Sequence, residues 1–174
     1  DDENYRKIRG NRIAYIFQEP MSSLNPLHTI EKQIAESLIL HRGFNEKEAE
    51  KEVLRLLKLT GIQNAEKRMK SYPFELSGGQ RQRVMIAMAI ANRPDILIAD
   101  EPTTALDVTV QEQIINLLNE LKKKLNMSVM FISHDLAVIR KIADRVLVMK
   151  DGRVVEQGTV KRIFENPSFI NSIV

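Results

Sequence analysis

Polar side chains that can do chemistry follow three short apolar segments of the sequence. These residues are Gln18, the adjacent pair Asp100 and Glu101, and His134. In an open parallel sheet, ligands bind beyond the carboxyl ends of the strands. If the three segments are neighbouring strands, an amide, two carboxylates and an imidazole meet at one edge. One such residue would mean little, but three strands that end this way predict a functional site.

The adjacent carboxylates of Asp100 and Glu101 point in different directions and can therefore do different jobs. One can hold Mg²⁺, usually through water, and the other can orient or deprotonate an attacking water. Two acidic residues after a strand also fit the plain start of a solvated loop. The residues that follow, Pro102 and the run Thr103–Asp107, favour the interpretation with metal and water.

A serine and two glycines stand directly before a segment with helical periodicity, in the order Ser77, Gly78, Gly79, Gln80. Free N–H groups at a helix start form an anion site, and glycines let a phosphate approach the backbone. The same residues fit an ordinary serine N-cap, which Ser-Gly-Gly alone favours. His134 has two interpretations too, because a lone histidine is more often a hydrogen-bonded structural residue than a phosphate ligand.

Strand and helix patterns place these residues in a mixed fold. The predicted strands cover residues 12–17, 96–99, 129–132, 145–149 and 153–156. The predicted helices cover residues 30–42, 46–60, 78–91, 108–125 and 136–143. No convincing strand lies between 19 and 91, whereas strands and helices alternate from 95 onward. This order predicts an α/β fold, a parallel sheet with covering helices, that carries a helical insert.

Composition excludes several classes of protein. The chain has 174 residues and a net charge of +3, with no cysteine. The missing cysteines rule out disulfides, cysteine-bound zinc and thiol catalysis. No apolar run reaches the roughly 18 residues of a membrane span, so we expect no direct membrane insertion. The small charge surplus, three tyrosines and no tryptophan offer no nucleic-acid stacking surface, so we expect no nucleic-acid partner.

Five motifs resemble, in order and over nearly the whole chain, those of ABC transporter ATPases. They are the Q-loop at Phe17–Pro20, the signature at Leu76–Gln80, Walker B at Ile96–Pro102, the D-loop at Ala105–Asp107 and the switch histidine at Ser133–Asp135. The residues Met21–Pro26 and Thr103–Val110 are similar to importer ATPases for dipeptides, oligopeptides and nickel. Residues 25–29 and 40–43 resemble the first cassette of the microcin C type of double-cassette ATPase.

The resemblance implies ATP and Mg²⁺ as cofactors and gives the residues after the strands their catalytic roles. Gln18 would sense Mg²⁺ and the lytic water, and Asp100 would support Mg²⁺. Glu101 would be the general base, and His134 would stabilise the γ-phosphate.

The resemblance also implies partners. The residues Ser77, Gly78, Gly79 and Gln80 would close over the γ-phosphate of ATP held by a second ATP-binding cassette, and Asp107 would communicate across that dimer. The Q-loop would contact transmembrane permease subunits. The protein would then power import of peptides or related solutes from the cytoplasmic face of the cell membrane, as a peripheral subunit.

The fold implied by the resemblance is an incomplete RecA-like parallel sheet with covering helices plus an all-helical subdomain. Residues 1–18 would be the end of the first part of the RecA-like core, with the Q-loop. Residues 19–91 would be the helical subdomain, 92–158 the later part of the core, and 159–174 a C-terminal tail.

One family motif is missing. The chain has seven glycines, and none begins a G-x-x-x-x-G-K-[ST] loop, the backbone cradle and lysine that hold the β- and γ-phosphates. In the family this loop precedes the Q-loop, so we expect a fragment that alone neither binds nor hydrolyses ATP. We also expect the fragment to expose apolar core surface and to be modestly stable or self-associated.

Two other functions stay open. A non-hydrolytic regulatory module would supply only the signature half of a composite site. Glu101 and His134 argue against it, because a site without turnover has no physical need for a base. The second alternative is a non-transport ABC ATPase that acts on DNA or ribosomes. The residues of the Q-loop resemble those of transporters and therefore favour transport.

Overall fold

The computed structural model describes residues 5, 7–19 and 23–166. Two parts of the predicted features lie outside the described residues. They are residues 20–22, at and just after the end of the Q-loop, and residues 167–174 of the expected tail. The chain divides into two compact units, Asp1–Ile132 and Ser133–Val174, and each is described by itself. The domain boundaries expected from the resemblance stay a prediction.

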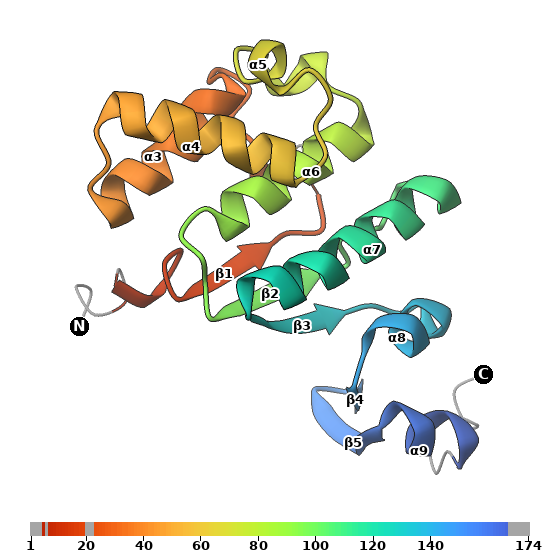
Figure 1. Cartoon of the computed structure of the whole chain (residues 1–174). Helices are drawn as coiled ribbons and strands as arrows, with labels where there is room; N and C mark the ends of the chain where they lie inside the picture. Colours follow the sequence, from red (N-terminus) through yellow and green to blue (C-terminus); the bar gives the residue numbers. More distant parts are fainter. Residues whose placement is uncertain (1–4, 6, 20–22, 167–174) are drawn as a thin grey trace. The chain divides into compact units, whose positions relative to one another are not determined.

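The first unit is built on a parallel sheet of three strands. They are β1 (Ile13–Ile16), β2 (Ile96–Asp100) and β3 (Ser128–Ile132), in the order β1-β2-β3 (Figure 1). Ile16 pairs with Ala99, which in turn pairs with Phe131, so the three strands end at one edge. The predicted parallel pairing of these strands is confirmed.

The helices of the first unit come mainly from the segment between β1 and β2. They are α3 (Ile30–Arg42), α4 (Glu46–Leu59), α5 (Ala65–Arg68), the 3-10 helix Pro73–Glu75, α6 (Gly78–Ile90) and, after β2, α7 (Val108–Leu125). Local signals fix their ends. Asn45 and Glu48 form a capping box at the start of α4, and Gly43 ends α3 with a φ of 65°.

One face of the sheet is packed against helices. Ala14, Ile16, Leu97 and Ala99 point to this face, and each is at most 4% exposed. Figure 1 shows the helices of this unit on one side of the sheet, and the stripe of α7 around Leu118 is buried there. The apolar stripe of α7 therefore faces a core.

The side chains on the opposite face of the sheet are partly exposed within this unit. Ile13, Tyr15 and Ile96 are 37–38% exposed, and Met130 on β3 is 52% exposed. Parallel sheets are usually covered on both faces. No element among the described residues of this unit covers the second face, so alternate residues of each strand stay accessible.

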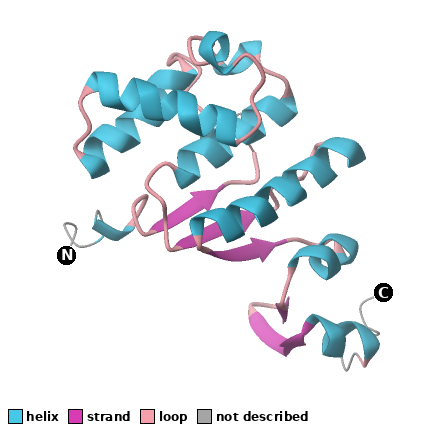
Figure 2. Cartoon of the chain, in the orientation of Figure 1, coloured by secondary structure: helices cyan, strands magenta, loops and turns pink. Residues whose placement is uncertain are grey.

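The second unit contains two short helices and a hairpin (Figure 2). Its elements are α8 (Leu136–Ile142), β4 (Arg145–Lys150), β5 (Arg153–Thr159) and α9 (Val160–Glu165). Asp151 and Gly152 form the turn between β4 and β5, with φ values of 50° and 73° that favour a tight hairpin. The expected place of β4 in the parallel sheet is wrong for the described residues, because β4 pairs with β5 alone, in antiparallel fashion.

Helix α9 lies in the segment that the sequence presented only as a tail. Thr159 begins it, and its Oγ1 accepts a hydrogen bond from the backbone N–H of Arg162 at 3.3 Å. Ile163 of this helix is fully buried. A helix of six residues with one buried side chain is too short to show helical periodicity in the sequence.

Candidate functional site

The ends of β1 and β2 bring two predicted catalytic residues into contact. Gln18 stands two residues after β1 and Glu101 one residue after β2, so the parallel register places them at the same level. The Nε2 of Gln18 donates a hydrogen bond to Oε2 of Glu101 over 2.8 Å. Thr104 donates a second one, from Oγ1 to the same oxygen, at 2.9 Å. An amide and a hydroxyl therefore orient this carboxylate.

The backbone of Glu101 adopts a conformation that is unusual for a residue with a side chain. Its φ is 44°, in the left-handed region, which costs about 1–2 kcal/mol for a residue other than glycine. Two backbone hydrogen bonds hold it, from its N–H to the carbonyl of Ile132 at 2.9 Å and from the N–H of Thr104 to its carbonyl at 3.1 Å. Such strain at a strand end is typical of functional sites.

Tyr15 is a site residue that the sequence reasoning missed. Its hydroxyl donates a 2.6 Å hydrogen bond to Oδ2 of Asp100, which binds the end of β2 to β1 a second time. This hydrogen bond, with smaller contributions from burial and from the charge of Asp100, raises the pKa of Tyr15 above its ordinary value of 10.0. The signal was present in the spacing, because Tyr15 is a diagonal neighbour of Asp100 on one face of the sheet.

The carboxylates at this edge could hold a Mg²⁺ ion only together with ligands from a substrate. Among the described residues, no three histidine, aspartate or glutamate side chains gather in a cluster that could hold a metal. Mg²⁺ is usually bound through one or two carboxylates together with the phosphates of a substrate. Asp100, half-buried at the strand end, fits such a shared site, in which nucleotide phosphates complete the donor set.

The signature residues form the first turn of α6. Ser77 is the N-cap, and its Oγ accepts a hydrogen bond from the N–H of Gln80 at 3.3 Å. The side chain of Gln80 returns a bond, accepting from the N–H of Ser77 at 3.0 Å. This geometry fits both interpretations of Ser77–Gln80, the ordinary serine N-cap and the anion site. The capped first turn of a 13-residue helix is also a place where an anion is stabilised.

The starts of α6 and α7 lie against each other. A Cβ added to Gly79 would come within 2.8 Å of Cγ1 of Val110, and one added to Gly78 within 3.6 Å of Cδ2 of Leu106. Asp107 caps α7, and its Oδ1 accepts from the N–H of Val110 at 2.9 Å. The predicted D-loop residue therefore stands beside the signature turn.

The two signature glycines should differ in their tolerance of alanine. We expect Gly79→Ala to lower the free energy of unfolding by about 1–2 kcal/mol, because its methyl group would overlap Val110. Gly78→Ala meets only an ordinary contact and should be neutral or stabilising by roughly 0.5 kcal/mol. Urea denaturation of the two variants gives the comparison. Equal losses, or no recovery when Val110→Ala is combined with Gly79→Ala, would contradict this packing.

His134 lies outside the first unit. It follows β3 and Ser133 and precedes Asp135, whose carboxylate caps α8 by accepting from the N–H of Ala137 at 2.8 Å. His134 itself is exposed. Its meeting with Gln18 and Glu101 at one edge of the sheet stays a prediction, because the two units are described separately.

A shallow groove opens beside β1, with a volume of about 190 Å³. Its walls come from the residues around β1, from α3 and from α6, and they include Phe17, Ser37 and Met88. Asn92 ties these segments together, because its Nδ2 donates to the carbonyl of Gly10 at 2.7 Å and to Oγ of Ser37 at 2.8 Å. The groove is mainly apolar and lies next to the strand that leads into Gln18.

A comparison with known families decides the identity of this fold. The family model named ABC transporter matches residues 1–104. The chain belongs to the ABC transporter family. This ABC chain is similar to the ATP-binding cassette MJ0796, solved as a dimer bound to ADP and Pi. The TM-score is 0.79 and the identity 36%, over 92% of this chain and 68% of that one.

Curated relatives of this ABC chain are transport proteins. It is 63% identical to the peptidoglycan transport ATP-binding protein YejF of Agrobacterium fabrum, over 93% of this chain and 30% of that protein. It is 53% identical to the oligopeptide transport ATP-binding protein AppD of Bacillus subtilis, over 95% of this chain and 51% of AppD. The ABC chain therefore spans about a third to a half of the length of these relatives. In its described part, no helix has the length and apolar character of a membrane span.

Proposed function

We propose that the chain is part of an ATP-hydrolysing cassette that powers the import of peptides or related solutes. The observation that carries this proposal is the contact of Gln18 with Glu101 across two strand ends, beside Asp100. The names of the relatives YejF and AppD support transport of peptide-like solutes. The cassette works at the cytoplasmic face of the cell membrane, together with a second cassette and transmembrane permease subunits.

Glu101 is the general base of the proposed reaction. Its carboxylate accepts a proton from a water that attacks the terminal phosphate of ATP. Gln18 and Thr104 both donate to Oε2, so the orientation of the carboxylate is set before the substrate arrives. Gln18 belongs to the Q-loop, so its hydrogen bond also couples the Glu101 carboxylate to that loop.

Asp100 holds the proposed Mg²⁺ site in place. Mg²⁺ bound with ATP would neutralise charge on the phosphates and stabilise charge that develops during transfer. The hydrogen bond from Tyr15 engages Oδ2 of Asp100, which fixes the rotation of the carboxylate. His134, which comes after the neighbouring strand, donates a hydrogen bond to the same terminal phosphate.

The signature turn acts on a second cassette. The N–H groups at the start of α6 and the Oγ of Ser77 bind the terminal phosphate of a nucleotide that the other cassette holds. Asp107 caps α7 beside Gly79, so a phosphate contact at the signature turn would also act on the start of α7. Each composite site therefore uses this surface of one cassette and the phosphate loop of the other.

The groove beside β1 receives a segment of the permease. Its walls offer apolar side chains such as Phe17 and Met88, and it borders the strand that leads to Gln18. A helix seated there would press on the Q-loop and on α6 together. Movement in the membrane would thereby reach both the catalytic carboxylate and the signature turn.

The chain alone does not hydrolyse ATP. A missing anion donor costs roughly 3 kcal/mol in a preorganised site, and the phosphate loop supplies several donors and a lysine. Micromolar binding of a nucleotide amounts to about −8 kcal/mol in total. A chain without that loop therefore retains no useful affinity.

A hybrid protein tests the proposed function. In this hybrid the chain replaces the matching 166 residues of AppD, to which it is 53% identical. We expect the hybrid to hydrolyse ATP and to support oligopeptide uptake in Bacillus subtilis cells that lack AppD, within about tenfold of AppD itself. A folded hybrid that does neither would contradict the proposal. Hydrolysis without uptake would contradict the import role alone.

A further inference from the structure

Two aromatic side chains at the end of β1 take part in the wall of the groove. The ring centroids of Tyr15 and Phe17 are 4.5 Å apart, and the ring planes are tilted by 41°. Both rings line the groove beside β1, and their side chains are 38% and 52% exposed. Aromatic rings at this separation attract each other, so a shift of one ring acts on the other. A segment seated in the groove would contact both.

The same short segment is bound to both carboxylates of the site. The hydroxyl of Tyr15 donates a hydrogen bond to Oδ2 of Asp100 at 2.6 Å. The Nε2 of Gln18 donates to Oε2 of Glu101 at 2.8 Å. Each hydrogen bond ends on a different carboxylate, so residues 15–18 offer two separate routes from the groove to the site. The route through Tyr15 ends at the proposed Mg²⁺ ligand.

The backbone around Tyr15 is held more firmly than its ring. β1 pairs with β2 in parallel, with Tyr15 opposite Ile98 and Ile16 opposite Ala99. Ile16 is fully buried on the other face of the sheet. A groove occupant would therefore move the Tyr15 ring rather than the strand, and the hydroxyl at the end of that ring holds Asp100.

We propose that Tyr15 is a positioning residue that couples occupancy of the groove to the Mg²⁺ affinity of the nucleotide site. This inference rests on the proposed function, which places Mg²⁺ at Asp100. A hydrogen bond of 2.6 Å from a hydroxyl to a carboxylate is in the charge-assisted range. Groups that hydrogen-bond a metal ligand fix its orientation and change the affinity for the metal when they are lost. A shifted Tyr15 ring would thus change how tightly Mg-ATP is held.

Tyrosine fluorescence of the purified chain tests the hydrogen bond without nucleotide. The chain has three tyrosines and no tryptophan, so its emission comes from tyrosine. A carboxylate that accepts a proton from an excited phenol quenches its emission, whereas an amide does not. We expect Asp100→Asn to raise the emission of the chain, and to have no effect when Tyr15→Phe is also present. A rise of equal size in both backgrounds, or no rise at all, would overturn the proposal.

Nucleotide binding by the hybrid with AppD tests the effect on Mg²⁺. The probe is a non-hydrolysable ATP analogue, titrated with Mg²⁺ or with EDTA. We expect Tyr15→Phe to lower the affinity about tenfold in Mg²⁺ and by less than about twofold in EDTA. Tyr72→Phe is the matched control, because Tyr72 is 39% exposed and pairs with Phe74 at 5.6 Å. It should change neither affinity.

The same titrations separate failure of this inference from failure of the proposed function. Equal losses in Mg²⁺ and EDTA for Tyr15→Phe, or no loss, would overturn the positioning role while the parent hybrid still binds the analogue. A parent hybrid that binds no analogue would contradict the proposed function and overturn this inference with it.

A chemical occupant of the groove tests the coupling itself. The chain has no cysteine, so Met88→Cys adds one defined site to the groove wall, once any cysteine of the AppD part is replaced by serine. Labelling with N-benzylmaleimide should lower the affinity in Mg²⁺ at least about threefold with tyrosine at position 15, and not at all with phenylalanine there. Leu40→Cys is the control, because Leu40 is 74% exposed on α3 and lies outside the groove wall. Labelling that acts equally in both backgrounds, or in neither, would overturn the coupling.

Discussion

Glu101→Gln in the hybrid with AppD is expected to lower the rate of ATP hydrolysis by at least about 100-fold. A glutamine keeps the shape of the side chain and can still accept hydrogen bonds from Gln18 and Thr104. It cannot accept a proton from water, so the loss falls on the chemical step. Steady-state hydrolysis and nucleotide binding, measured on the same variant, separate this loss from a loss of affinity.

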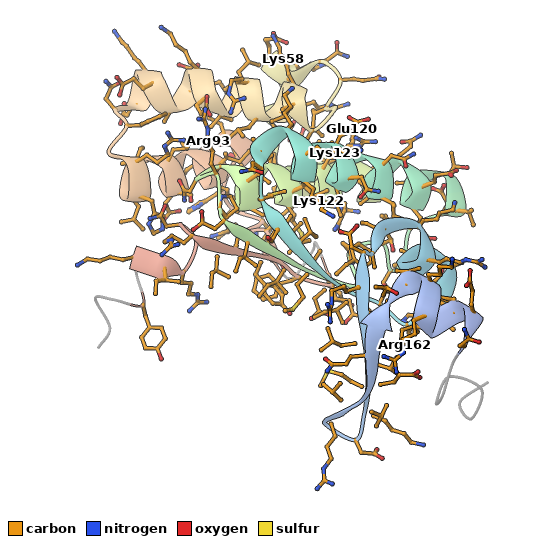
Figure 3. All side chains as sticks on the ribbon, turned by 60° about the horizontal axis from the view of Figure 1, so that its bottom comes forward. Lys58, Arg93, Glu120, Lys122, Lys123 and Arg162 are labelled. Atoms are coloured by element: carbon orange, nitrogen blue, oxygen red, sulfur yellow. The ribbon has the colours of Figure 1, made fainter. Side chains whose placement is uncertain are left out.

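Glu120→Gln is the control for that experiment. Glu120 is an exposed carboxylate of α7 and is labelled in Figure 3. Its change should leave hydrolysis within about twofold, because surface substitutions away from a site have small effects. A Glu101→Gln hybrid that hydrolyses ATP at the rate of its parent would show that another group is the base. It would leave the parallel sheet and the signature turn unaffected.

Leu97→Ala is expected to lower the free energy of unfolding by about 2–5 kcal/mol. Leu97 is the second residue of β2 and is fully buried on the sheet face that packs against helices. Its truncation leaves a cavity next to a fixed backbone. Urea denaturation at sub-micromolar protein, followed by far-UV circular dichroism, measures the loss without a contribution from self-association.

Ile96→Ala provides the comparison on the opposite face. Ile96 is the neighbour of Leu97 in the same strand but points to the other face of the sheet and is 38% exposed. Its truncation at low concentration should cost about 1 kcal/mol or less, because it removes little buried contact. Losses of equal size for the two variants would mean that both faces of the sheet are covered in the monomer.

Much of this fold follows from signals within four residues of one another. Asn45, Ser77 and Asp107 each stand one residue before a helix, and each accepts a hydrogen bond from the N–H three residues on. Side chains of this type favour the N-cap position strongly, so the sequence reveals it. The meeting of Gln18 with Glu101 was also predictable, because parallel strands end at one edge of a sheet.

The features that the sequence did not reveal depend on contacts between distant segments. The first four residues of β2, Ile96–Ala99, are a continuous apolar run, and such a run does not tell which faces of the strand are covered. The role of Tyr15 depends on the strand register, which sets it diagonal to Asp100, a residue 85 positions away in the sequence. The pairing of β4 with β5 alone, and the positive φ of Glu101, likewise arise from tertiary structure.

Calorimetric titration of the purified chain with Mg-ATP tests the central claim most directly. That claim is that the chain carries the carboxylate and signature parts of an ABC cassette but not its phosphate loop. We predict a folded far-UV spectrum and no saturable heat up to about millimolar nucleotide. Saturable binding in the micromolar range, weakened by changes at Ser77 or Asp100, would contradict the claim. It would mean that these residues assemble a nucleotide site without the loop.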